Sequence, residues 1–156
     1  MTTGRVRFLN RSNGGVPKTP VAEARVTRDG LEGDRQRHRE FHGGPMRALC
    51  LYAMERIAAL QAEGHPIAPG TVGENVTVEG VRWEHVVPGV RLRVGEVELE
   101  VTAFAAPCKT IRHSFAEHEF TRISEKLHPG WSRVYTRVLV EGTIREGDSV
   151  AIVEPA

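Results

Sequence analysis

Short segments in which β-branched and polar residues alternate, separated by glycines and prolines, constrain the fold of this chain more than any other feature. The sequence holds 16 glycines and 9 prolines among 156 residues, and these residues break strands and form turns. We expect a hairpin that turns at Gly95 and Glu96. The segments that we predict to be strands are residues 5–10, 22–28, 74–80, 91–95, 96–104, 133–142 and 148–154.

Two helices are expected among these strands. Residues 45–63 begin with a proline, place apolar side chains on one face and end before Gly64. Cys50 falls on that apolar face, so we interpret it as a packed core residue. Residues 117–127 show a weaker helical spacing. Many short strands with few helices predict a mainly β protein in one domain, a closed or nearly closed β-barrel with a few peripheral helices.

The overall composition excludes some classes of function. The formal net charge is +1 at pH 7, so a nucleic-acid partner is not expected. No apolar run approaches the roughly 18 residues of a membrane span, and the first residues lack the apolar stretch of a signal peptide. We therefore expect a cytoplasmic protein with no membrane partner and with free thiols at its 2 cysteines. An excess of Lys and Arg over Asp and Glu in residues 1–50 fits a local anion pocket.

One cysteine has neighbours that are unusual for a buried thiol. Cys108 follows Pro107, which predicts that the preceding strand ends close to it, and Lys109, Arg112 and His113 come next. Nearby cations favour the thiolate, which is the form that attacks electrophiles and binds soft metals. Cys108 is therefore a candidate catalytic or metal-binding residue. The alternative is a partly buried thiol whose basic neighbours are incidental.

Two other segments contain candidate binding residues. Arg35 and His42 precede a Gly-Gly pair at the start of the first expected helix, an arrangement that can hold a phosphate and can equally be a plain turn. Glu74 and Asn75 lie between glycine turns at the start of a strand, where Asn75 could bind the edge of a heterocycle or cap the turn. No spacing of Cys and His predicts a structural zinc site.

These segments, taken in order, resemble the MOSC domain, the family of the C-terminal domain of molybdenum cofactor sulfurases. The similarity lies in residues 30–52, 70–81, 90–115 and 128–150. Within the family, the chain resembles most the stand-alone bacterial MOSC proteins that reduce N-hydroxylated bases. The resemblance implies a barrel that holds a molybdopterin-type molybdenum cofactor, with Cys108 of the Pro-Cys motif as the metal ligand. It also implies that the cofactor is bound by Arg35, His42, Glu74, Asn75, Lys109, Arg112 and Arg133.

The resemblance implies a function as well, and three alternatives stay open. In the first, the protein is an oxidoreductase that reduces small N-hydroxylated compounds at the cofactor, with electrons from a donor protein. In the second, Cys108 carries a persulfide from a sulfur donor to an acceptor. In the third, the protein binds the cofactor and passes it on without catalysis.

Overall fold

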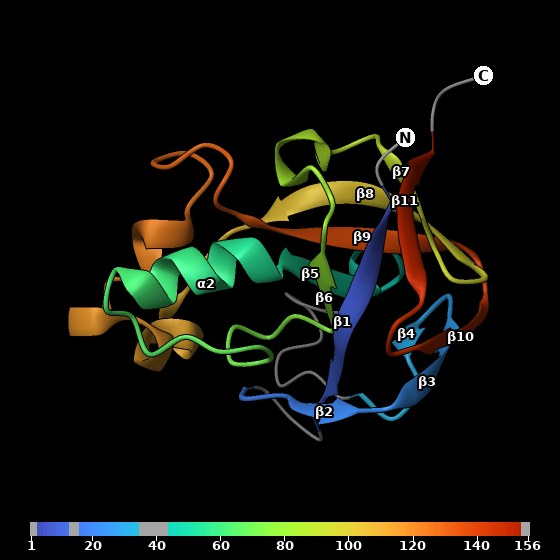
Figure 1. The fold of residues 1–156 in the computed structure, drawn as a ribbon, viewed down its shortest axis with the longest axis horizontal. Helices are drawn as coiled ribbons and strands as arrows, with labels where there is room; N and C mark the ends of the chain where they lie inside the picture. The colour runs from blue at the N-terminus through green and yellow to red at the C-terminus, as the bar shows by residue number, and fades with distance from the viewer. Residues whose placement is uncertain (1–2, 13–15, 35–43, 154–156) are drawn as a thin grey trace.

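A closed β-barrel forms the body of the protein in the computed structural model, which describes residues 3–12, 16–34 and 44–153 (Figure 1). Its strands, in order around the barrel, are β1 (Gly4–Arg11), β11 (Ser149–Val153), β7 (Arg91–Val94), β8 (Val97–Ala105), β9 (Arg133–Val140), β5 (Leu49–Ala53) and β6 (Val76–Glu79). β1 pairs with both β11 and β6, which closes the sheet. Buried valines and leucines of these strands pack in the core. The prediction of a mainly β barrel is confirmed.

Shorter strands extend the barrel. β2 (Thr19–Val21) pairs with β1, and a separate small sheet consists of β10 (Gly142–Arg145), β3 (Glu23–Thr27) and β4 (Gly30–Leu31). Figure 1 shows this small sheet on the opposite side of the barrel from α2 (Met54–Ala62). Every segment that the sequence predicts to be a strand contains one. The hairpin is confirmed too, because Val94 pairs with Val97 across the turn.

The helix expected over residues 45–63 is a helix only in its second half. The segment begins with a 3₁₀ turn, η1 (Pro45–Arg47), and continues as β5, whose 5 residues are all buried. β5 pairs with β9 on one side and β6 on the other. A strand buried on both faces is a continuous apolar run, and periodicity alone does not distinguish such a run from a buried helix. The assignment of Cys50 to a helix is therefore wrong, although its side chain is buried as predicted.

The helix expected over residues 117–127 is also wrong. Glu117 and His118 have φ angles of 56° and 57°, in the left-handed region that interrupts a right-handed helix. The short 3₁₀ helices of the chain after η1 are η2 (Trp83–His85), η3 (Lys109–Ser114), η4 (Ala116–His118) and η5 (Phe120–Ile123). Arg122 of η5 donates two hydrogen bonds to Glu63, at 2.9 and 2.8 Å, which ties this segment to the end of α2. In the part of the chain that the structure describes, no helix has the length and apolar character needed to cross a membrane.

Candidate functional site

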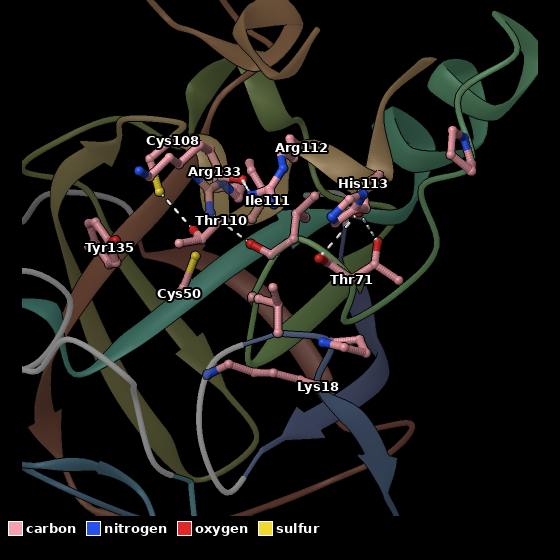
Figure 2. A pocket seen from close by; sticks show the side chains of 17 residues that line it. Lys18, Cys50, Thr71, Cys108, Thr110, Ile111, Arg112, His113, Arg133 and Tyr135 are labelled. Atoms are coloured by element: carbon pink, nitrogen blue, oxygen red, sulfur yellow. Dashed lines mark hydrogen bonds between the residues drawn. The ribbon is translucent and has the colours of Figure 1, made fainter. Parts of the chain in front are cut away.

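A cavity of about 600 Å³ lies between the barrel wall and the segment that follows β8. Figure 2 shows the side chains around it. They come from β5 and β9, from residues 16–18, from the loop over residues 66–73, and from residues 108–114. A concave site of this volume suits a cofactor or another small molecule.

The barrel wall contributes three neighbouring side chains to the cavity. Arg133 and Tyr135 lie two residues apart on β9, so they point to the same face of the sheet. Cys50 of β5 lies opposite Tyr135 in the register of the two strands. All three side chains are buried. Because paired strands fix their backbones, this wall is a firm support for whatever the cavity holds.

Cys108 lies on the loop after β8. That strand ends at Ala105, which confirms that it stops close to the cysteine. The Cys108 thiol is free and partly exposed, and its Sγ lies 2.8 Å from Oγ1 of Thr110. Figure 2 shows Cys108, Cys50 and Tyr135 at the same end of the cavity. An accessible sulfur therefore faces the buried wall.

The described lining of the cavity carries cations but no acidic side chain. Lys109, Arg112 and Arg133 all line it, and among the described residues no Asp or Glu does. Arg112 donates from Nη1 to the backbone carbonyl of Lys109 at 2.8 Å. Lys18 also lines the cavity, but its Nζ lies 2.7 Å from a carboxylate oxygen of Asp34, in an ion pair that is itself buried. The remaining positive charge favours an anionic ligand.

Arg133 is the most buried of the three unpaired cations, with 6% of its surface exposed. Its Nη1 donates to the carbonyl of Val72 at 2.7 Å, and its Nη2 donates to the carbonyls of Ala105 and Ala106 at 3.3 Å each. Its Nε is buried and has no hydrogen-bond partner among the described residues. Carbonyl groups do not neutralise a guanidinium, and the buried Glu74, which interacts with the charge of Arg133, forms no ion pair with it among the described residues. A buried charge without a paired counterion is costly. An anion in the cavity would offset part of that cost.

Glu74 and Asn75 lie behind the wall. Both are fully buried, and neither lines the cavity. Asn75 accepts a hydrogen bond from the backbone N–H of Cys50 and donates one to Asp34, both at 2.9 Å. Glu74 accepts from the hydroxyl of Thr77 at 3.0 Å, and burial raises the pKa of its carboxyl group. The structure thus gives these two residues a supporting position, in which Asn75 fixes the backbone at Cys50.

The predicted site residues divide into three groups. Glu74 and Asn75 are buried behind the cavity wall, and Arg35 and His42 lie outside the described residues. The structure brings the others together around one cavity, namely Cys108, Lys109, Arg112 and Arg133.

Two lining residues, Cys50 and Tyr135, are missing from the predicted site. Burial raises the pKa of the Cys50 thiol to about 11 and that of the Tyr135 phenol to about 12. Both groups are therefore protonated near neutral pH. The signal that could have found them is a strand assignment for residues 49–53, because a strand there can pair with β9 whereas a helix cannot.

A β-barrel with an accessible cysteine and unpaired cations at one cavity defines a protein suited to hold an anionic ligand next to a thiol. Comparison with known proteins gives its family. Residues 38–151 match the MOSC domain, so the chain belongs to the MOSC family. The resemblance seen in the sequence is confirmed.

Curated relatives and solved structures agree with this assignment. The chain is 30% identical to the uncharacterized protein YflK of Bacillus subtilis (strain 168), in an alignment that covers 89% of this chain and 63% of YflK. It is 34% identical to the protein YiiM of Escherichia coli (strain K12), over 70% of this chain and 51% of YiiM. The chain therefore spans less than two thirds of the length of either relative. The crystal structure of YiiM from Geobacillus stearothermophilus superposes with a TM-score of 0.73 at 25% identity, covering 97% of this chain and 75% of that one.

Proposed function

We propose that this MOSC protein binds a molybdopterin-type molybdenum cofactor in the cavity and uses it to reduce small N-hydroxylated compounds. One observation carries the proposal: the accessible Cys108 thiol and three cations line the same cavity, and the described lining contains no acidic side chain. The family supports it, since MOSC domains are associated in general with the molybdenum cofactor.

The residues present fit the chemistry of such a cofactor, which combines a phosphate, a polar heterocycle and a soft metal. The guanidinium groups of Arg112 and Arg133 suit the phosphate. The Nε of Arg133 has no hydrogen-bond partner among the described residues, which leaves it available to an anion. The sulfur of Cys108 suits a soft metal. Apolar side chains such as Val72 and Ile111 also line the cavity and can contact a flat ring.

Each of these residues has its own part in the proposed reaction. When bound, the cofactor would supply the redox chemistry of this reaction. Cys108 would hold the metal through its sulfur. Arg133 would keep the loop before Cys108 in place through the carbonyls of Ala105 and Ala106. Tyr135, which stays protonated near neutral pH, would offer a proton at its hydroxyl oxygen to a substrate in the cavity.

The reaction needs a source of electrons. Conversion of an N–OH group to N–H with release of water consumes electrons and protons, and we assign the electrons to a separate donor protein in the cytoplasm. The substrate is a small molecule, because the cavity of about 600 Å³ must hold it together with the cofactor.

An activity assay tests the proposal. The protein is purified from a host that makes the cofactor and is incubated with an N-hydroxylated test compound and a reduced dye as electron donor. We expect the corresponding amine from the wild type and none from Cys108→Ala at matched folding. Bound molybdenum without turnover would favour a cofactor carrier. An extra sulfur atom on Cys108 in protein without molybdenum would favour a persulfide carrier.

A further inference from the structure

The chain has 2 cysteines, and both line the same cavity. Cys50 comes from β5, in the barrel wall, and Cys108 comes from the loop after β8. Both thiols are free, and Figure 2 shows them at one end of the cavity with Thr110 and Tyr135 nearby. Both sulfurs contribute to the raised pKa of the Tyr135 phenol, which agrees with this placement. The two thiols therefore line one cavity in the fold although they are far apart in the sequence.

The two cysteines differ in freedom of movement. The backbone of Cys50 is fixed on both sides, because its N–H donates to the Asn75 side chain at 2.9 Å and its carbonyl accepts from the Asn75 N–H at 2.7 Å. Cys108 lies between β8 and η3, outside any strand or helix, and its sulfur forms a hydrogen bond with the hydroxyl of Thr110. Cys108 is also the more accessible of the two, since Cys50 is only 4% exposed.

We propose that Cys50 and Cys108 form an oxidisable thiol pair, in which Cys108 reacts first with a hydroperoxide and Cys50 then closes an intramolecular disulfide. In the first step the Cys108 sulfur is oxidised to a sulfenic acid, and the hydroperoxide is reduced to water or an alcohol. In the second step the Cys50 sulfur attacks the Cys108 sulfur, the S–O bond breaks, and the hydroxyl group leaves as water with the Cys50 proton. A dithiol reductant reverses the change.

This disulfide would protect the more accessible thiol and would occupy the sulfur that is proposed to hold the metal. Without a second thiol, a sulfenic acid is open to further oxidation, which is irreversible at the sulfinic stage in most proteins. A neighbouring thiol stops the reaction at a reversible product. The oxidation itself does not depend on the proposed function, but its effect on cofactor binding does, because it would consume the proposed metal ligand.

Mass spectrometry of the cofactor-free protein tests the pair. Dilute hydrogen peroxide is added at low protein concentration, and we expect the intact wild-type mass to fall by about 2 Da, for two lost hydrogen atoms, and to recover with dithiothreitol. Trypsin digestion without reduction should then yield residues 48–56 joined to residues 94–109, the peptides that contain the two cysteines. In Cys50→Ala, Cys108 should instead gain oxygen atoms, and dithiothreitol should not restore the original mass.

The outcomes that would overturn the proposal are equally direct. The proposal fails if Cys108 of the wild type gains oxygen atoms as it does in Cys50→Ala. It also fails if the wild type forms disulfide-linked dimers instead of the joined peptides, because Cys50 then does not form the disulfide with Cys108. If Cys50→Ala does not fold, the joined peptides in the wild type still decide the question. Because the protein carries no cofactor in this experiment, failure here leaves the proposed reductase activity to its own assay.

Discussion

Cys50 and Cys108 face one cavity from two different kinds of structure. The Cys50 side is part of the barrel: paired strands fix its backbone, its side chains are buried, and the Cys50 and Tyr135 side chains are held in their neutral forms. The Cys108 side is a loop followed by the 3₁₀ helix η3, with an accessible sulfur and the exposed cation Lys109. A rigid wall thus supports one side of the cavity, and an adjoining irregular segment presents an accessible sulfur and a cation to it.

The largest expected difference between the two sides is the reactivity of their thiols. Iodoacetamide should modify Cys108 at least ~100-fold faster than Cys50 at pH 7, because Cys50 is buried and its pKa of about 11 leaves little thiolate. The rate at Cys50 should rise roughly tenfold for each pH unit between 7 and 9, since the thiolate fraction grows in that proportion below the pKa. Peptide mapping of timed samples measures both rates. Comparable rates at neutral pH would remove the distinction between the two sides.

The next largest effect concerns the buried cation of the wall. Arg133→Met should lower the free energy of unfolding by about 2 kcal/mol, because the carbonyls of Val72, Ala105 and Ala106 lose their donors. Urea denaturation of the cofactor-free protein measures this. A variant as stable as the wild type would mean that relief of the unpaired charge outweighs the lost hydrogen bonds, and that Arg133 serves ligand binding alone.

The smallest effect on stability is expected on the loop side. Arg112→Ala should change the free energy of unfolding by less than about 0.5 kcal/mol, since its described contact is one hydrogen bond to the Lys109 carbonyl. The same change should weaken cofactor retention during dialysis, because it removes a cation from the cavity. Arg91→Ala, an exposed arginine on β7 outside the cavity, is the matched control for lost charge. Equal retention in the two variants would remove Arg112 from the site.

The same comparison explains what the sequence could predict. The predicted strands, the hairpin and the end of β8 near Cys108 follow from local signals, namely alternation, glycine turns and Pro107. The loop side of the cavity depends mostly on residues that are neighbours in the sequence, so its cations could be found there. The wall depends on pairing between β5 and β9, which lie far apart in the chain. Because the sequence assigns residues 45–63 to a helix, that pairing is not predicted, and neither is the position of Cys50 at the cavity.

Glu74 and Asn75 show a second limit. Their polar side chains between two glycines resemble a binding loop, yet both are fully buried and their contacts go to the chain itself. The motif alone does not show whether these polar side chains bind a ligand or form hydrogen bonds within the protein. Here the Asn75 amide forms hydrogen bonds to the backbone of Cys50 and to the carboxylate of Asp34. Both partners are far from Asn75 in the sequence, so a local pattern does not predict these bonds.

The proposed role of Cys108 is to hold a metal, which needs an accessible sulfur. Its most direct test is the molybdenum content of protein purified from a host that makes the cofactor, with Cys50→Ala as the control for the other thiol of the cavity. We expect near-stoichiometric molybdenum in the wild type and in Cys50→Ala, and its loss in Cys108→Ala with folding intact. Molybdenum retained by Cys108→Ala would contradict the account, as would its absence from all three proteins in a host that loads another molybdenum enzyme.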